Sequence, residues 1–302
     1  WLARRRRSGY RILDTSDKLR RWLDDLDPEA PLAVDTETTG LRRDEADLVG
    51  ICLAGSNRQG QDLAPAYIPV RWREPGKGGG PAGDTLFPVE PVQSRLEEVK
   101  QLAGPVLAAT GSLKVGQNLK YDASVLANHG ITLRGIRFDT MLESYVLDST
   151  ATRHDMDSVA LKYLGHSNIK YEDVAGKGAK QLSFNEVPIE DASPYAAEDA
   201  DVTLRLHETM WPKLLAEEGL EEIYRDIELP LVIVLSDMEQ AGVAIDTGML
   251  ARQSRELAGR IMEIEQEAHR EAGQSFNLGS PKQIQEILFD KLQLPVLAKT
   301  PK

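Results

Sequence analysis

The stretch PLAVDTETTGL (residues 31–41) decides the fold and raises a question of charge. The apolar run at 32–34 is typical of a buried β-strand, and two acids, Asp35 and Glu37, follow it. Residues two apart in an extended chain point to the same side, so this pattern predicts both carboxylates on one face. At about 4 Å two such charges repel by about 4 kcal/mol at an effective dielectric constant of about 20, so the site needs a compensating charge.

The composition indicates a soluble globular protein. Of its 302 residues, 41% are hydrophobic and 28% are charged, and no apolar run approaches the roughly 18–20 residues of a membrane span. The N-terminal stretch WLARRRRSGY lacks the apolar segment of a secretory signal. The single cysteine, Cys52, excludes an internal disulfide and fits a reducing cytoplasm.

The charge balance and the chain ends carry further information. A net charge of −12 argues against holding nucleic acid by bulk attraction alone, because proteins that do so are basic. It is compatible with an enzyme whose local acidic site recruits cations. The chain starts at Trp1 instead of methionine and ends in LAKTPK, which completes no element, so we expect it to be part of a longer chain.

The first part of the chain is predicted to be an α/β domain. Three strand patterns separated by turn-like segments indicate an antiparallel meander, and alternating helices and strands after it favour a mixed sheet covered by helices. The Gly-rich stretch 73–84 lacks the Gly-Lys-Ser/Thr ending of a phosphate loop and is expected to be a surface loop. The predicted strands lie at 32–34, 48–53, 67–70 and 113–115, and the predicted helices at 18–26, 92–102, 121–128, 140–147, 156–164 and 194–218.

After Gly219 the pattern becomes helical throughout, with long amphipathic segments at 227–246 and 249–271. This change predicts three parts: a linker and leading helix (1–30), the α/β domain (31–218) and a helical part (219–302).

A last helix is predicted within SPKQIQEILFDKL. Ser280 is the expected N-cap, Pro281 the first helical residue, and Gln283 would complete a capping box.

Two later segments carry acids that could join the first pair. VGQNLKYDASVLANHG places Asp122 in the first turn of a helix, where it could also be a simple dipole partner. SPYAAEDADVTLRLH places Tyr195 and Asp199 four residues apart, so they are neighbours on one helical face. Taken singly, each acid could be a turn, cap or surface residue, and we expect Glu198 and Asp201 of the same helix to face solvent.

Taken together, the acids of these segments predict a metal site. All-oxygen ligands select hard ions such as Mg²⁺ or Mn²⁺, and two ions about 3.5–4 Å apart are used for in-line phosphodiester displacement. One cysteine excludes thiolate zinc clusters, and there is no Gly-x-Ser-x-Gly elbow. The five histidines show no paired ligand spacing and are expected to be surface or capping residues.

These motifs resemble the proofreading 3′–5′ exonuclease domain of bacterial family A DNA polymerases. DTETTGL, VGQNLKYD and YAAEDADVTLRLH resemble its three exonuclease motifs in order, and RGIRFDTMLESYVLDS, RHDMDS and AGKGAKQLSFNEV resemble the segments between them. IELPLVIVLSDMEQAGVAID and FNLGSPKQIQEILFDKL are similar to the start of the polymerase thumb. The resemblance implies an RNase H-like α/β fold of the DEDDy type for 31–218, followed by an all-helical, truncated thumb region of the polymerase domain for 219–302.

The resemblance also implies roles for the matching residues. Asp35, Glu37 and Asp199 would hold a first divalent ion, and Asp35 with Asp122, the latter mostly through water, would hold a second. Tyr195 would orient the attacking water. The related class has a histidine five residues before the last acid, where this sequence has a proline, so the tyrosine type is implied.

Contacts with the substrate strand follow from the same resemblance. Leu41 would wedge against the terminal base and Tyr171 would pack on the strand end; such stacking contributes about 1–3 kcal/mol per base and tolerates any base. As an alternative, Leu41 and Tyr121 could be core residues. The remaining contacts to the terminal nucleotides would come from Gln117, Asn118, Tyr121 and Arg153.

The sequence therefore predicts a monomeric, metal-dependent 3′–5′ exodeoxyribonuclease that acts on single-stranded or frayed DNA 3′ ends in the cytoplasm, at the nucleoid, without a membrane. It would be the editing part of a polymerase whose palm and fingers lie beyond this chain. Two alternatives stay open. A free-standing RNase D-like enzyme would trim RNA, although the thumb-like helices argue against it; a catalytically inactive domain would only support a polymerase, although all four acids are present.

Overall fold

The computed structural model describes residues 9–72, 93–150 and 152–298. It divides into two compact units, Trp1–Ala241 and Gly242–Lys302. The Gly-rich stretch 73–84 lies outside the described residues, so its predicted loop stays a prediction. No helix in the described ranges combines the length and the apolar character needed to cross a membrane.

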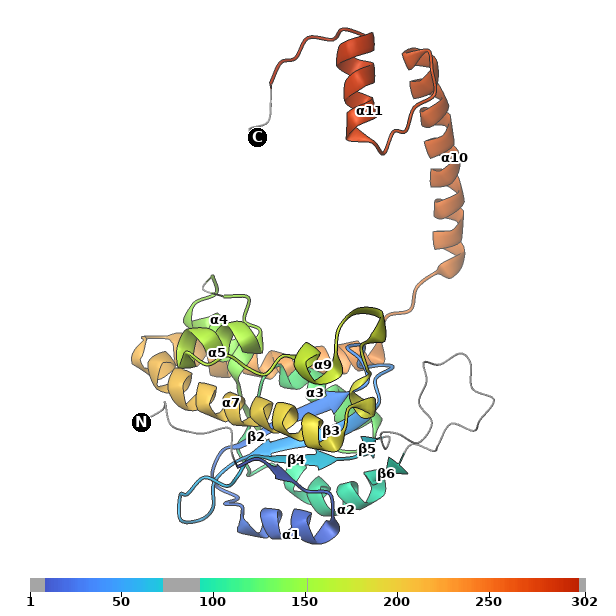
Figure 1. Ribbon diagram of the computed structural model, residues 1–302. Helices are drawn as coiled ribbons and strands as arrows, with labels where there is room; N and C mark the ends of the chain where they lie inside the picture. The colour runs from blue at the N-terminus through green and yellow to red at the C-terminus, as the bar shows by residue number, and fades with distance from the viewer. Residues whose placement is uncertain (1–8, 73–92, 151, 299–302) are drawn as a thin grey trace, which may run out of the picture. The chain divides into compact units, whose positions relative to one another are not determined.

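The first unit is built on a six-stranded mixed sheet with the order β1-β4-β3-β2-β7-β8 (Figure 1). The predicted meander is confirmed, since β2, β3 and β4 pair antiparallel in sequence order. On the other side of β2, β7 and then β8 add in parallel. The strands are β1 (Arg11–Ile12), β2 (Leu32–Thr38), β3 (Leu48–Ala54), β4 (Ala66–Pro69), β7 (Lys114–Gly116) and β8 (Ile136–Asp139), and a separate ribbon pairs β5 (Arg71–Trp72) with β6 (Gln93–Ser94).

Strand β2 runs further than its apolar residues predict. It continues to Thr38 because β3 stays paired with it, with Asp35 opposite Cys52 and Glu37 opposite Gly50. The two acids therefore lie within a central strand, not after it. Strands β1 and β8 cannot be predicted from the sequence, because they are too short to show a periodic pattern.

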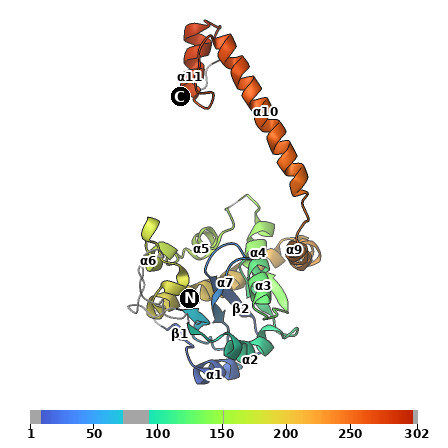
Figure 2. The ribbon, with the colours of Figure 1, turned by 90° about the vertical axis from the view of Figure 1, so that its right-hand side faces the viewer.

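Helices cover both faces of this sheet, as predicted (Figure 1, Figure 2). Alternate residues of β2 point to opposite faces, so Leu32 and Val34 join a core with α1 (Ser16–Asp25), α2 (Leu96–Leu107) and α3 (Leu119–Asn128). Ala33 faces the long helix α7 (Ile189–Ala216), which packs on the sheet through Ala192, Ala196 and Ala200. These small side chains let α7 approach the strands closely.

The remaining helices of the first unit surround α7 and α3. Helices α4 (Thr140–Leu147) and α5 (Met156–Leu164) have the predicted bounds and pack on α7. Helix α7 itself starts at Ile189, before the predicted Pro194, which is accommodated inside the helix although it has no N–H to donate. The others are α6 (Tyr171–Ala175), 3₁₀ turns at Gly178–Lys180 and Phe184–Glu186, α8 (Leu220–Ile223), a π-helical turn at Tyr224–Glu228 and α9 (Leu229–Ala241).

The boundary between the two compact units lies after Ala241, whereas the sequence pattern predicts a boundary near Gly219. Helix α9 belongs to the first unit because it packs on α3, where Val232 and Ser236 are buried. Whether the polymerase part begins at Gly219 stays a prediction.

The second unit is helical in its described residues, with α10 (Thr247–Ala272) and α11 (Pro281–Gln285), which continues as a π-helical turn (Glu286–Lys291). Ser280 caps α11 and Pro281 is its first residue, as predicted. The predicted capping box is wrong, because Oε1 of Gln283 accepts from the backbone N–H of Asn277 at 2.8 Å instead of from Ser280. The N–H of Ser280 donates to the Asn277 carbonyl.

Candidate active site

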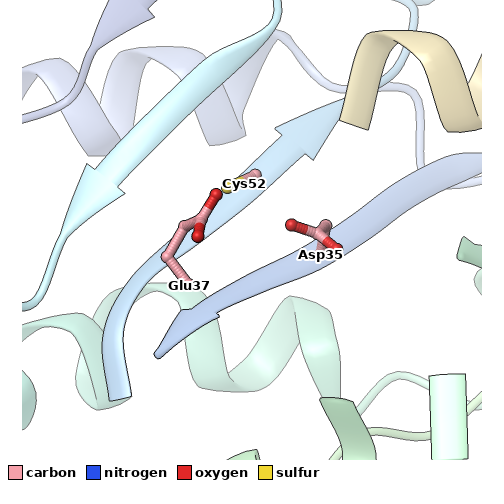
Figure 3. A group of neighbouring side chains, drawn as sticks. All are labelled: Asp35, Glu37 and Cys52. Carbon is pink, nitrogen blue, oxygen red and sulfur yellow. The ribbon is translucent and has the colours of Figure 1, made fainter. Parts of the chain in front are cut away.

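The acids of the first motif lie at the centre of the sheet, on the face that α7 covers. Asp35 and Glu37 share this face of β2, as their spacing predicts, and Cys52 reaches the same point from β3 (Figure 3). One ligand atom from each of these three side chains lies within 4.8 Å of the other two. Two carboxylates and a thiol therefore meet in one small space.

Asp122 enters this centre from α3 and is fastened to β2. Its Oδ1 accepts from the backbone N–H of Thr36 at 3.0 Å and from the Thr36 hydroxyl at 2.6 Å. Thr36 stands between Asp35 and Glu37, so these bonds hold a carboxylate from a distant segment next to the pair. Asp122 is only 2% exposed.

Asp199 and Tyr195 approach from α7. Both side chains are partly exposed, and their four-residue spacing places them one turn apart on the helix. The charge of Asp199 raises the pKa values of both Asp35 and Glu37. The acids of the three motifs thus come together in one place.

The electrostatics of this group are unfavourable when all four acids are ionised. Burial is the largest cause that raises the pKa of each carboxyl, and the neighbouring acids add to it. For Glu37 these neighbours are Asp35, Asp199 and Asp122. The pKa of Asp199 rises to about 8, and those of the other three lie well above their usual values.

The donor set fits hard divalent cations. Oε1 of Glu37 is buried and has no hydrogen-bond partner. Among the described residues, no lysine or arginine forms an ion pair with any of the four acids. Converging carboxylate oxygens that lack a compensating charge are the ligands that Mg²⁺ and Mn²⁺ prefer.

An open pocket of about 540 Å³ lies beside this centre. Tyr195 and Asp199 line it together with Arg153 and Tyr171, so the structure brings two of the expected substrate contacts next to the third motif. Arg153 is highly exposed and pairs with Asp155 at 3.2 Å.

Aromatic rings form one wall of this region. The rings of Tyr171 and Tyr195 meet edge to face at 6.2 Å, and Phe184 lies 5.6 Å from Tyr195. The Tyr171 hydroxyl donates to the carbonyl of Leu182 at 2.9 Å, which orients its ring. Phe184 is a neighbour of the site that no sequence pattern predicted.

The loop after β2 carries Leu41, which is 94% exposed and therefore not a core residue. Tyr121 holds this loop, since its hydroxyl donates to the Gly40 carbonyl at 2.7 Å and lies 2.8 Å from the Thr38 hydroxyl. The Tyr121 ring also packs against the core. The position of Tyr121 is therefore compatible with both expectations, a contact to the terminal nucleotides and a core residue.

Gln117 and Asn118 form hydrogen bonds within the turn before α3. The Gln117 amide donates to the His154 carbonyl at 2.7 Å and accepts from the Thr140 hydroxyl at 2.5 Å. Asn118 has a left-handed backbone (φ 64°), and its N–H donates to Asp139. Gln117 therefore lies within the fold's own hydrogen-bond network, not pointing freely at the pocket.

Two expectations about α7 are wrong. Glu198 and Asp201 do not face solvent but are 1% and 4% exposed, because the helix is covered on several sides. Glu198 accepts from the Ile169 N–H at 2.6 Å and pairs with His166 at 3.0 Å, which ties down the segment leading to Tyr171.

One histidine, His207, differs from the expectation of a surface or capping residue, whereas His129 is the C-cap of α3 as predicted. His207 is buried, and its Nδ1 lies 2.7 Å from Oε1 of Glu143. The spacing of residues along a helix shows which of them share a face. It does not show which faces are buried by other elements of the fold.

Cys52, Thr36 and Asp139 are further residues near the acids that were not predicted from the sequence. Asp139 had a local signal, an acid directly before a helix, and it accepts from the N–H groups of Asn118, Leu119 and Met141. Cys52 and Thr36 had no such local signal. Cys52 lies opposite Asp35 only through the register of β2 and β3, and Thr36 meets Asp122 only through the packing of α3.

A mixed sheet whose central strand carries paired acids, joined by acids from two helices, is the fold expected of an exonuclease domain. The chain belongs to the 3′–5′ exonuclease family, whose model matches residues 10–215. Residues 247–302 match the DNA polymerase family A model. The predicted order, an exonuclease domain followed by the start of a family A polymerase domain, is confirmed.

Bacterial DNA polymerases are among the relatives of this chain. The chain is 50% identical to the DNA polymerase I of Pseudomonas aeruginosa over 281 residues, which is 92% of this chain and 29% of that protein. It is 42% identical to the DNA polymerase I of Rhizobium leguminosarum over 300 residues, which is 97% of this chain and 28% of that protein. The chain thus spans less than a third of the length of these relatives.

Two solved structures have the same fold. The POL domain of Pol1 from M. smegmatis, in complex with DNA primer-template and dNTP, matches with a TM-score of 0.67 and 26% identity, over 96% of this chain and 42% of that one. Brucella melitensis NrnC matches with a TM-score of 0.53 and 19% identity, over 78% of this chain and 93% of that one, and supports the fold alone.

Proposed function

We propose that this chain is a metal-dependent 3′–5′ exonuclease that removes nucleotides from DNA 3′ ends and so edits the product of a DNA polymerase I. The observation that carries the proposal is the meeting of Asp35, Glu37, Asp122 and Asp199 from three separate segments. The intact protein would also be a DNA-directed DNA polymerase and would work as a monomer on cytoplasmic DNA at the nucleoid.

The acids would hold two divalent ions, Mg²⁺ or Mn²⁺. Asp35, Glu37 and Asp199 would hold the first, and Asp35 together with Asp122 the second. When bound, such ions supply activation of a water molecule and stabilisation of the leaving 3′ oxygen. The buried, unpartnered Oε1 of Glu37 supports this assignment, since an uncompensated buried carboxylate is costly.

Tyr195 would position the attacking water. Burial, followed by the charge of Asp199, raises the pKa of the Tyr195 hydroxyl. The hydroxyl therefore keeps its proton and can donate a hydrogen bond while its oxygen accepts one. Its place one turn before Asp199 sets it at the edge of the acid group.

Tyr171, Arg153 and Leu41 would receive the end of the strand. Tyr171 and Arg153 line the pocket beside Asp199, where an aromatic face can pack on any base and a guanidinium can reach a phosphate. Leu41 is exposed and free to insert at the terminal base. A mismatched end frays at low cost, so unpairing itself would favour removal of errors.

The test of this function is the loss of nucleotide release in Asp199→Asn and Asp35→Ala. Each variant removes a ligand whose ion contributes several kcal/mol to the transition state, so the Mg²⁺-dependent rate on a single-stranded DNA oligonucleotide should fall about a thousandfold or more. Circular dichroism should show an unchanged fold. Asp191→Asn, on the exposed side of the same helix, is the matched control and should cleave normally.

The same assay separates the alternatives. RNA of the same sequence should be degraded more slowly than DNA. An RNase D-like enzyme would degrade the RNA faster. Calorimetry with Mn²⁺ should detect two binding events, and an inactive support domain would show none. Near-normal activity in either acid variant contradicts the proposed function.

A further inference from the structure

Glu198 is a buried carboxylate that lies next to Asp199 on α7 and takes no part in the proposed reaction. It is only 1% exposed. Consecutive helical residues point about 100° apart, so the side chain of Glu198 leaves α7 in a different direction from that of Asp199. Burying a carboxylate is costly unless other groups donate hydrogen bonds to it, so the partners of Glu198 indicate its role.

The partners of Glu198 lie in the segment 166–169, which leads to Tyr171. Oε2 of Glu198 accepts from the backbone N–H of Ile169 at 2.6 Å, a short bond of the kind that charged acceptors make. Oε1 lies 3.0 Å from Nε2 of His166. One side chain therefore attaches this segment at two points to the helix that carries Asp199.

The same segment sets the position of Tyr171. Tyr171 is the first residue of α6 and follows Ile169 by two residues. The residue between them, Lys170, is the N-cap of α6 and donates its backbone N–H to Asp173 at 3.1 Å. The chain thus passes from the attached segment directly into the helix of Tyr171, which lines the open pocket together with Asp199.

We propose that Glu198 is a positioning residue that fixes the distance between Asp199, which would hold a metal ion, and the Tyr171 ring, which would pack on the terminal base. This inference rests on the proposed function, since that function assigns a substrate contact to Tyr171. A terminal base that packs on a fixed ring brings its phosphate to a defined place beside the acids. A ring that moved would bind the strand end less tightly.

A purely stabilising role of Glu198 would give different results. Such a role would lower the melting temperature of a variant without changing which strand ends the protein prefers. Stacking contributes to binding only when the strand end has a base and the aromatic ring is in place. A positioning role therefore makes the discrimination between strand ends with and without a base depend on Glu198.

The experiment measures binding of the metal-free, 302-residue protein to fluorescent single-stranded DNA by anisotropy. Two oligonucleotides are compared, one with a normal 3′-terminal nucleotide and one with an abasic 3′-terminal residue. The wild-type protein should bind the abasic end about tenfold more weakly, because stacking on Tyr171 is lost. In Glu198→Ala and in Tyr171→Ala this difference should shrink to about twofold, and the double variant should lose no more than either single variant.

Three further variants control the interpretation. Glu198→Gln keeps an oxygen that can accept from Ile169, so its discrimination should stay near the wild-type value. His166→Ala removes one of the two contacts at a partly exposed position, tolerates folding better than a change at Glu198, and should give an intermediate discrimination. Glu208→Ala changes an exposed acid of the same helix and should behave as the wild-type protein. Circular dichroism verifies the fold of each variant.

Steady-state kinetics with Mg²⁺ adds a second readout. KM for DNA should rise about tenfold in Glu198→Ala while kcat falls much less, and Mn²⁺ binding should be retained because Asp199 is intact. Wild-type discrimination in both Glu198→Ala and His166→Ala, or a wild-type protein that does not discriminate, overturns the inference. If discrimination depends on Glu198 in a protein that never releases nucleotides, the positioning role stands and the proposed exonuclease activity fails, so the two failures are distinguishable.

Discussion

Two buried carboxylates of this protein, Asp139 and Glu37, differ in whether their oxygens have hydrogen-bond partners. Asp139 is 1% exposed, and its oxygens accept from the backbone N–H groups of Asn118, Leu119 and Met141. These bonds lower its pKa against the effect of burial. Glu37 is almost as buried, but one of its oxygens has no partner and three acids surround it. A bound cation would therefore stabilise the ionised form of Glu37.

At the same scale, Tyr195→Phe separates positioning from binding. The ring and its packing against Tyr171 and Phe184 remain, and only the hydroxyl is lost. We expect the turnover rate to fall about ten- to a hundredfold, the value of one well-placed hydrogen bond, with KM for single-stranded DNA nearly unchanged. Steady-state kinetics on a DNA oligonucleotide measures both. A raised KM at an unchanged rate would contradict the role given to this hydroxyl.

Among the elements, α9 holds two parts of the site in place. Glu239 pairs with Arg43 of the loop that carries Leu41 and with Lys120 of α3, the latter at 2.7 Å. The Arg43 guanidinium also donates to the Glu239 carbonyl at 3.2 Å. A helix outside the exonuclease match thus ties the Leu41 loop to the helix of Asp122.

Glu239→Gln should loosen this attachment. The side chains of Glu239, Arg43 and Lys120 are about one-third exposed, so their two ion pairs contribute about 1 kcal/mol to the free energy of unfolding, which lowers the melting temperature by about 2–4 °C. Hydrogen exchange should also become faster in α9. Asp237→Asn changes an exposed acid of the same helix and should have neither effect. Equal melting of the two variants would show that these pairs do not hold α9.

For the whole molecule, the acid group couples stability to pH and to metal. The pKa of Asp199 is about 8, and those of Asp35, Glu37 and Asp122 are also raised. The folded protein therefore keeps protons that the unfolded chain releases near pH 4. Because the folded state binds more protons, stability falls as the pH rises from about 4 to about 8.

We expect the metal-free protein to melt several degrees lower at about pH 8 than at about pH 5.5, and Mg²⁺ to restore the loss at the higher pH only. Binding of Mg²⁺ should tighten with pH up to about 8, since the carboxyls must lose their protons. Thermal denaturation with and without Mg²⁺ measures both effects. Asp199→Asn should weaken the dependence of the melting temperature on pH. A melting temperature of the metal-free protein that rises with pH would contradict the inference that the folded state binds more protons than the unfolded chain.

The sequence by itself determined the kinds of element and the chemistry of the motifs. Apolar runs placed β2, β3 and β4, helical periodicity gave α4 and α5 their bounds, and the spacing of Tyr195 and Asp199 put them on one face. These features are encoded within a few neighbouring residues. Boundaries that depend on partners were missed, such as the extension of β2 along β3 and the early start of α7.

Only the tertiary structure decided which residues meet and which are buried. Cys52 faces Asp35 through the register of β2 and β3, and Asp122 reaches the same point through its bonds to Thr36. Glu198 appeared solvent-exposed from its helix alone but is buried by the segment that it binds. The physical reason is that register and burial depend on packing between segments far apart in the chain, which no local pattern specifies.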